Sequence, residues 1–426
     1  MGGGLLQLVA YGAQDVYLTG NPQITFFKVV YRRHTNFAIE AIQQTFNGNP
    51  GYGNTVNCQI SRNGDLINRM YLQVDVPSAT NAGYTYVNYL GLRLLKSVVI
   101  EIGGQQIDKH YSDWMYIWNE LSLPTGKRYA YDKMVGANSN DTTGSTDAAT
   151  TTTLYVPLEF WFCRNVGLAL PLIALQYHEV KVKIEFEQRS NCVVDTNGDI
   201  DVTGATATNF PDLKDMSLWV DYIFLDTDER RRFAQLSHEY LIEQLQFTGT
   251  ETLGTGSTRV KLNFNHPCKE LVWVAKAKGT TARNARWYDY SDIDAQDGNA
   301  VVPNEKAKNP FVDAILQLNG NDRFAVRKGS YFNLVQPYQH HTNVSANPGI
   351  NVYSFALKPE DHQPSGTLNM SRIDTATLMV NTVDIMQTNT TRSNNKAMDY
   401  SGINIYAVNY NVLRILSGMG GLAYSN

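Results

Sequence analysis

The sequence predicts an all-β protein made of two similar domains in tandem. Short runs rich in Val, Ile, Tyr, Phe and Thr recur along the 426 residues, and clusters of Gly, Asn, Asp and Pro separate them, as expected of strands joined by turns. One such run, residues 180–186, alternates strictly between apolar and charged side chains, which is typical of a half-buried strand. The third observation is an internal repeat.

The repeat consists of five pairs of short segments that occur in the same order in both halves of the chain. The pairs are 37–43 with 240–246, 70–72 with 271–273, 100–104 with 316–320, 155–158 with 353–356, and 171–180 with 364–373. Their offsets run only from 193 (364 − 171) to 216 (320 − 104). Chance similarity between strands is the alternative. The shared order favours a tandem duplication of an all-β domain of about 200 residues.

Individual elements follow from local patterns. Further strands are expected at 98–102, which ends at Gly103-Gly104, at 271–274 and at 378–380. Two helices are expected: one over 21–31, where Asn21-Pro22 suits the N-terminus, and one over 112–121 with Ser112-Asp113 as its cap. The polar stretches 138–153 and 195–209 are expected to be exposed loops, and the charged run 225–232 a linker between the two domains.

The composition excludes several classes of protein. Lys and Arg number 36 and Asp and Glu 40, so the formal net charge is -4, without the positive surface of a typical nucleic-acid binder. The four cysteines have no CxxC spacing, which argues against a disulfide framework or a zinc knuckle. We expect free thiols in or near the cores: Cys58, Cys163, Cys192 and Cys268.

No catalytic motif is complete. His178-Glu179 and His238-Glu239 begin like a zinc-protease motif, but the fifth position is Val182 in one and Ile242 in the other. The adjacent His340 and His341 would point to opposite faces of a strand, which suits chelation poorly. We therefore expect no catalytic, metal-binding or cofactor-binding residues, and the chain has the character of a binding or structural protein.

Long blocks of the chain carry a family resemblance. They are LVAYGAQDVYLTGNPQITFFKVVYRRHTNFAIE from Leu8, ISRNGDL from Ile60, GLALPLIALQYHEVK from Gly167, WVDYIFLDTDERRRFAQLSHEYLIEQLQ from Trp219, LNFNHP from Leu262, QLNGNDRFAVRKGSYFNLVQPYQ from Gln317, YSFALKP with QPSGTLNMSRID from Tyr353, and NIYAVNYNVLRILSGMGGLAY from Asn404. In these blocks the chain closely resembles the major capsid proteins of large icosahedral double-stranded DNA viruses, especially those that infect algae. The divergent stretches, at about 79–89, 138–153, 191–212 and 276–308, are loops, where proteins that share a scaffold vary.

The resemblance implies a fold of two consecutive jelly rolls, each of eight antiparallel strands in two facing sheets, with short helices in the N-terminal segment and the loops. It divides the chain into an N-terminal segment at the capsid base (1–34), a first jelly roll (35–224), a linker (225–236) and a second jelly roll (237–426). It also implies a homotrimer whose six similar rolls approximate a hexagon, the shape that tiles flat capsid faces.

A structural, non-enzymatic role in the virion capsid follows from the resemblance, with assembly in the host cytoplasm and no cofactor. The implied partners are other copies of the chain, neighbouring capsomers, minor capsid and penton proteins, through these the inner viral membrane, and surface glycans, without direct nucleic-acid contact. The alternative is a carbohydrate-binding or carbohydrate-active β-sandwich, since jelly rolls also build lectins and the chain has 6 Trp and 25 Tyr.

Terminal segments and glycan acceptors complete the expectations. We expect the apolar N-terminal segment to pack beneath the rolls or against a neighbour, and residues 417–426 to form a flexible or latching tail. The loops 138–153 and 276–308 are expected at the outward end and dispensable to a core. Four Asn-x-Ser/Thr matches are glycosylation candidates, and we expect only Asn369 to be buried: Asn140, Asn343, Asn369 and Asn389.

Overall fold

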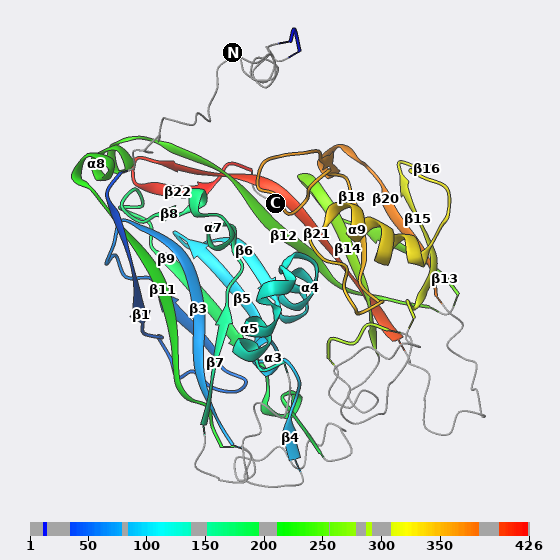
Figure 1. Ribbon diagram of the computed structural model, residues 1–426, viewed down its shortest axis with the longest axis horizontal. Coiled ribbons are helices and arrows are strands. Elements are labelled where there is room, and N and C mark those ends of the chain that lie inside the picture. Colours follow the sequence, from blue (N-terminus) through cyan, green and yellow to red (C-terminus); the bar gives the residue numbers. More distant parts are fainter. Residues whose placement is uncertain are drawn as a thin grey trace, which may run out of the picture. The chain divides into compact units, whose positions relative to one another are not determined.

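The computed structural model describes residues 12–14, 35–78, 84–137, 151–195, 211–254, 256–277, 287–291, 308–382 and 400–424. The chain divides into two units, Met1–Phe37 and Ala38–Asn426, and the sheets described below belong to the second, apart from Phe37 at the start of β1 (Figure 1). The predicted helix over 21–31 lies outside the described residues, as does the segment 1–34 apart from residues 12–14.

The first half of the chain forms two sheets. One has the order β1-β11-β3-β7, with β8 paired to β3, and the other the order β2-β9-β5-β6, while β4 and β10 form a small separate ribbon. The bounds are β1 Phe37–Gln44, β2 Thr55–Gln59, β3 Leu66–Pro77, β4 Tyr84–Tyr86, β5 Leu95–Ile102, β6 Gln105–Tyr111, β7 Thr151–Pro157, β8 Leu170–Pro171, β9 Val180–Phe186, β10 Val193–Asp195 and β11 Lys214–Leu225.

The second half repeats this topology strand by strand. Its sheets have the orders β12-β21-β14-β18 and β13-β20-β15-β16, with β19, β22 and β17 as short additions. The bounds are β12 His238–Thr252, β13 Ser257–Leu262, β14 Pro267–Ala277, β15 Phe311–Leu318, β16 Asn321–Asp322, β17 Arg327–Lys328, β18 Asn351–Ser354, β19 Leu368–Asn369, β20 Ala376–Thr382, β21 Tyr400–Leu416 and β22 Met419–Leu422. The duplication predicted from the repeat is confirmed, and each half is a jelly roll whose two sheets together have eight main strands in the described residues.

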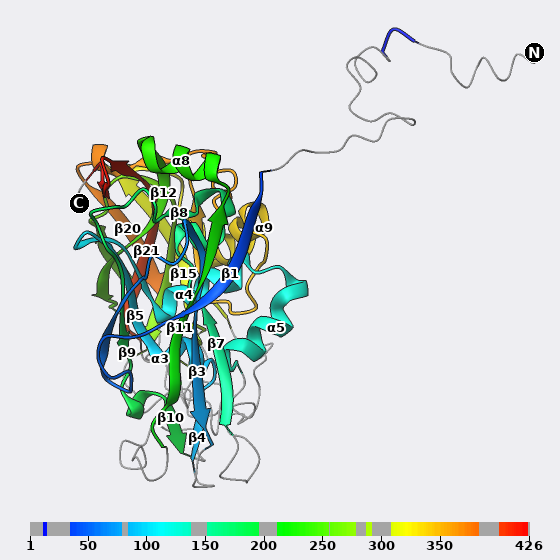
Figure 2. The same ribbon diagram turned by 90° about the vertical axis from the view of Figure 1, so that its left-hand side faces the viewer.

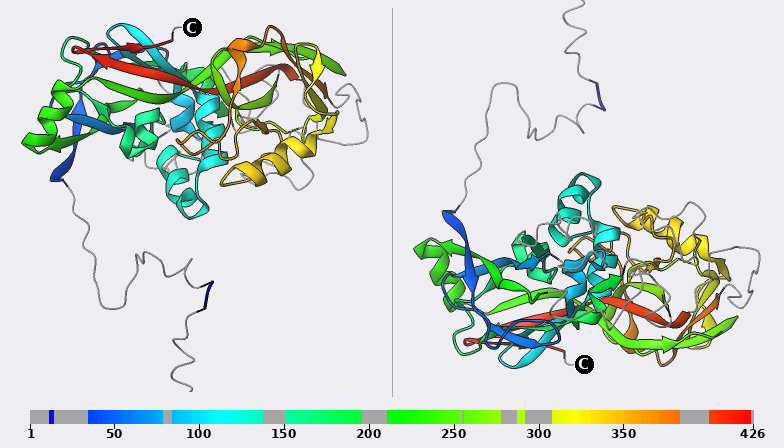
Figure 3. Two further views of the ribbon diagram at one scale, coloured as in Figure 1. Left: turned by 90° about the horizontal axis from the view of Figure 1, so that it is seen from above. Right: turned by 90° about the horizontal axis from the view of Figure 1, so that it is seen from below.

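Helices fill the connections between strands. They are α3 Leu90–Leu94, α4 Ser112–Ser122, α5 Thr125–Val135, α7 Trp161–Arg164, α8 Thr227–Gln235 and α9 Gln336–His340, with the 3-10 turns η1 Val166–Leu168, η2 Arg189–Asn191 and η4 Met370–Arg372 and the π-helical segment η3 Tyr331–Val335. Corresponding loops carry helices in both rolls: α4 and α5 precede β7, and η3 and α9 precede β18. Figure 3 shows the two groups, cyan and yellow, on the same side of the Ala38–Asn426 unit.

The local predictions for strands are confirmed in β5, β9, β14 and β20, and the helix over 112–121 is confirmed as α4. Its predicted cap is wrong, because Tyr111 is the N-cap residue and makes no side-chain cap bond. The Ser112 hydroxyl is buried and donates instead to the Leu92 carbonyl at 2.8 Å. The third repeat segments, 100–104 and 316–320, fall at the ends of β5 and β15, which hold equivalent places in the two rolls.

Two of the predicted loops need correction at their ends, and two other segments can be described. The charged run expected as a linker does connect β11 to β12, and it forms most of α8, whose first turn is capped by the Asp226 carboxylate accepting from the Thr227 amide at 2.7 Å. Residues 151–153 belong to β7 and Asp195 to β10, so these ends of the expected loops are strand. Residues 138–150 and 196–210 lie outside the described residues. Of the two alternatives for the C-terminal tail, the described residues favour a latch, because β22 forms an antiparallel hairpin with β21.

Candidate functional site

The most extensive feature that links distant parts of the chain is the contact between the two rolls. Two hydrophobic clusters meet the sheet β12-β21-β14-β18 from opposite sides. Leu271 and Trp273 of β14 pack in the core of the second roll, whereas Val272 and Val274 belong to the same cluster as the core of the first roll. This sheet is therefore buried on both faces, which explains why residues 271–275 are apolar without alternation.

Aromatic side chains make much of this contact. Trp114 of α4, in the first roll, lies 5.4 Å from the ring of Tyr406 in β21. Phe247 of β12 stacks on Tyr406 at 4.8 Å and meets the edge of Tyr111 at 5.0 Å. Trp114 and Tyr406 are almost fully buried, so each ring removes a large apolar surface from water.

Polar groups fix the register of the two rolls. The Asp108 carboxylate of β6 accepts a hydrogen bond from the Leu245 amide of β12 at 3.0 Å. The Gln244 side chain donates to the Ile107 carbonyl. At the C-terminal hairpin, the Tyr177 amide of the first roll donates to the Gly418 carbonyl at 2.9 Å. The tail is therefore a latch on the first roll.

A buried ion cluster spans the same interface. The Glu243 carboxylate of β12 meets Arg164 of the first roll at 3.1 Å and Lys269 of β14 at 2.8 Å. Burial by itself raises the pKa of Glu243, but His362, Arg164 and Lys269 outweigh it and lower the pKa to about 2. The Arg164 guanidinium also covers the ring of Trp118 at 4.4 Å. Glu243 is thus an anion held by cations from both rolls.

Residues 287–291 correct the expectation that 276–308 is dispensable to a core. Tyr288 and Tyr290 are buried and belong to the cluster of the first roll. The Tyr288 hydroxyl hydrogen-bonds the Ser112 hydroxyl, and the Tyr290 hydroxyl donates to Asp113 at 3.1 Å. Trp287 lies under the Arg93 guanidinium at 3.7 Å. Residues 287–291, which belong to the second half of the chain, therefore pack as part of the core of the first roll.

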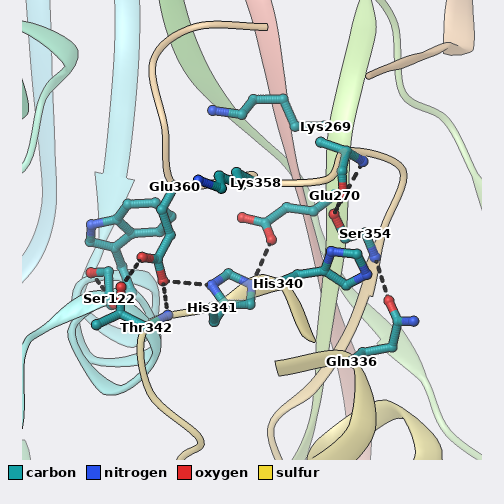
Figure 4. Close-up of polar contacts among 12 residues, drawn as sticks. Ser122, Lys269, Glu270, Gln336, His340, His341, Thr342, Ser354, Lys358 and Glu360 are labelled. Atoms are coloured by element: carbon teal, nitrogen blue, oxygen red, sulfur yellow. Dashed lines mark hydrogen bonds and ion pairs between the residues drawn. The ribbon is translucent and has the colours of Figure 1, made fainter. Parts of the chain in front are cut away.

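A second cluster of buried charged side chains lies at the C-terminal end of α9. His341 donates from Nδ1 to Glu360 at 2.8 Å and from Nε2 to Glu270 at 2.9 Å (Figure 4). The Thr342 amide also donates to Glu360, at 3.0 Å. Burial lowers the pKa of His341, but the two carboxylates outweigh it and raise the pKa to about 9. His340 and His341, which were expected on a strand, instead lie at the end of helix α9. The side chain of His341 is a buried imidazolium there.

The thiols have no disulfide partner. Cys58, Cys192 and Cys268 are buried and Cys163 is partly buried. Burial raises the pKa of Cys58 to about 11 and that of Cys192 to about 12. These thiols stay protonated near neutral pH, as structural cysteines do. Within the described ranges, no group of three or more His, Cys, Asp or Glu side chains is placed to hold a metal ion.

Two of the four glycan candidates are described. Asn343 is half-buried, and its backbone N–H donates to the Leu121 carbonyl at 2.9 Å. The prediction that Asn369 is buried is wrong: the residue is exposed, and its side chain accepts from the Ser371 amide at 3.1 Å because it caps η4. Asn140 and Asn389 lie outside the described residues. Among the residues described, no helix is both long and apolar enough for a membrane span.

Sequence reasoning missed the residues that join the rolls. The available signal was the unbroken apolar run 271–275, which indicates a strand covered on both faces. Nothing in the sequence indicated that Arg164 and Glu243, 79 residues apart, would pair across the contact.

Comparisons with known proteins agree with this architecture. Two family models match: "Major capsid protein N-terminus" over residues 25–226, and "Large eukaryotic DNA virus major capsid protein" over residues 229–421. The major capsid protein of Pyramimonas orientalis virus is 53% identical, and that of Paramecium bursaria Chlorella virus 1 is 49% identical, each match covering 100% of both chains.

Solved structures add the fold. A chain from a quasi-atomic model of the Paramecium bursaria Chlorella virus 1 capsid aligns with a TM-score of 0.77 at 43% identity, covering 94% of this chain and 100% of that one. The Faustovirus major capsid protein aligns with a TM-score of 0.72 at 16% identity, covering 95% and 94%. The second likeness concerns the fold alone.

Proposed function

This chain belongs to the major capsid protein family of the large eukaryotic DNA viruses, and from that premise we propose that three copies close into one capsomer of a virion shell. The observation that supports the proposal is the shared sheet β12-β21-β14-β18, which holds two alike rolls in one fixed relation. Three such chains supply six similar rolls, and a ring of six approximates the hexagon that tiles a flat capsid face.

The proposed role depends on the stiffness of the chain. A capsomer must transmit lateral forces without bending between its rolls, and close-packed interiors resist such deformation. The apolar contacts of Trp114 and the buried ions around Glu243 supply that stiffness. No step of this role needs a catalytic group, so we assign the chain no enzymatic activity.

The wider assignments follow from the same proposal. The boundaries 1–34, 35–224, 225–236 and 237–426 describe an N-terminal segment at the capsid base, the first roll, a linker and the second roll. The partners are neighbouring capsomers, minor capsid and penton proteins and, through these, the inner viral membrane. Assembly takes place in the host cytoplasm. The alternative, a carbohydrate-binding or carbohydrate-active β-sandwich, has no support among the relatives, whose names are those of capsid proteins.

The proposed trimer has a direct test. Light scattering of the purified protein at micromolar concentration should give three times the 47.8 kDa chain mass, because an obligate interface above about 2,000 Å² keeps subunits together. Negative-stain images should show hexagonal outlines. A monomer under these conditions would contradict the capsomer.

Surface glycans form a separate proposal, with Asn343, Asn369, Asn140 and Asn389 as the candidate acceptors. The exposure of Asn369 supports it as an acceptor, although its side-chain oxygen already accepts a hydrogen bond from the Ser371 amide at the start of η4. The intact mass of protein taken from virions should exceed 47.8 kDa, and peptide mapping would identify the acceptors. A mass equal to the bare chain would refute glycosylation.

A further inference from the structure

The two rolls have the same topology but are covered differently. In β12 of the second roll Ile242 is 0% exposed, because the first roll lies over it. Its repeat partner in β1 of the first roll, 203 residues earlier, is Ile39, which is 52% exposed. Glu40, the partner of the buried Glu243, is also exposed. The first roll therefore leaves open the surface that the second roll has covered.

The adjoining sheet shows the same difference. In the second roll Tyr406 pairs with Val272, and in the first roll Trp219 pairs with Tyr71 at the equivalent place in the sheet. Tyr406 is covered by α4, whereas Trp219 and Tyr71 lie on an outward face, with parallel rings 6.3 Å apart. Figure 2 looks onto β1, β11, β3 and β7, and in the described part of the chain no element of the second roll lies over them.

The covering elements are duplicated as well. Helix α4 places Trp114 on Tyr406 of the second roll, with Trp118 four residues later under Arg164, and its counterpart is η3 with α9. There Leu334 and Tyr338, also four residues apart, are 51% and 81% exposed. Arg164, between β7 and β8, meets Glu243, and Lys358, in the equivalent connection between β18 and β19, is exposed.

We propose that a second copy of this chain covers β1 and the Trp219–Tyr71 face with its η3–α9 helix and its Lys358 loop. This inference rests on the proposed trimer and names the surfaces that form it. Leu334 and Tyr338 pack on the aromatic face, as α4 does within the chain, and Lys358 meets Glu40 of the next copy. Because the two surfaces differ, the contact is head-to-tail, and three such contacts close a ring.

Engineered cysteines test the contact between subunits. The double variant Glu40→Cys with Lys358→Cys should form, under mild oxidation, a disulfide-linked ladder that ends at three chains on a non-reducing gel. An equimolar mixture of the two single variants should stop at two chains, and each single variant alone should stay uncrosslinked. Crosslinking of a single variant with itself would show a two-fold contact and overturn the proposal, as would no crosslinking in a double variant that is still trimeric.

Charge reversal provides a second readout. Glu40→Lys and Lys358→Glu should each weaken the trimer at least tenfold in dissociation constant, and the double reversal should recover most of that loss. Tyr338→Asp should also give monomers, whereas Val312→Asp, 50% exposed on β15 of the other sheet, should stay trimeric. All these side chains are exposed, so circular dichroism should show an unchanged fold. A wild-type monomer would refute the capsomer itself, while a wild-type trimer with unaffected Tyr338→Asp and charge-reversal variants would refute only this contact.

Discussion

Two clusters of buried charged side chains in the described residues are each held together by opposite charges. Glu243 has Arg164 and Lys269, and His341 has Glu270 and Glu360. A buried pair adds little when compared with an apolar replacement, but removal of one partner leaves a charge stranded in a medium of low polarity. These clusters therefore fix one arrangement of the chain more than they raise its stability.

The first prediction concerns alkaline pH. Because the folded-state pKa of His341 is raised from 6.5 to about 9, its protonation adds stability that is fully present below pH 6.5. That stability is lost as the pH rises through 9, and the total is on the order of 3 kcal/mol. Urea unfolding of the wild type between pH 6 and 9.5 should show the decline.

The variant His341→Gln should be less stable at pH 6 and should lack this part of the decline. His340→Gln is the matched control, since the half-buried His340 hydrogen-bonds a backbone carbonyl, that of Leu357, through Nδ1 at 3.0 Å. Parallel pH profiles for the wild type and His341→Gln would show that His341 carries no extra proton in the folded state.

The second prediction concerns the ion cluster at the interface. Lys269→Met removes one cation from Glu243 and should lower the free energy of unfolding by about 3–5 kcal/mol. Lys181→Met breaks an exposed pair with Glu179 and should leave the stability almost unchanged, because water screens exposed ion pairs. Denaturant midpoints of the two variants, compared at neutral pH, check the contrast, and equal losses would contradict it.

At the scale of the elements, the segment 287–291 is held in place by a close approach between its backbone and that of Gly349. A Cβ on Gly349 would lie 1.8 Å from the Tyr290 carbonyl oxygen. Gly349→Ala should therefore push the segment away and cost at least about 2 kcal/mol in urea unfolding. Gly126 in α5 has open space around it, so Gly126→Ala should be neutral or stabilising by up to about 1 kcal/mol. Similar stability of the two variants would show that the segment tolerates displacement.

Elements were predictable where local pattern decides them. The alternation in 180–186 defines β9 with the same bounds, and the repeat pairs strands that hold equivalent places in the two rolls. Positions decided by distant partners were not predictable. Tyr288 lies in a polar, divergent stretch, and its burial depends on Ser112, 176 residues earlier. Asn369 was expected to be buried because it borders a strand, but β19 is only two residues long and leaves it exposed.

On the scale of the whole molecule, the shared sheet makes the second roll dependent on the first. If the first roll unfolded alone, Val272, Val274 and Tyr406 would be exposed to water together. Full burial of one such side chain is worth about 1.5–3 kcal/mol, so unfolding the first roll alone would carry this extra cost for each of the three, which favours joint unfolding of the two rolls. Tandem domains joined by a small polar interface do not couple in this way.

The last prediction follows from that coupling. Phe186→Ala empties a buried site in β9 of the first roll and should cost about 3–5 kcal/mol. If the rolls open together, hydrogen exchange should speed up in β5 and β9 and equally in β14 and β21 of the second roll, because amides that exchange through a common opening share its free energy. Phe311→Ala, in the cluster confined to the second roll, should give the same joint response from the other side. An increase that stops at β5 and β9 would mean that the second roll keeps its fold without its neighbour, and that the buried sheet face does not couple the two.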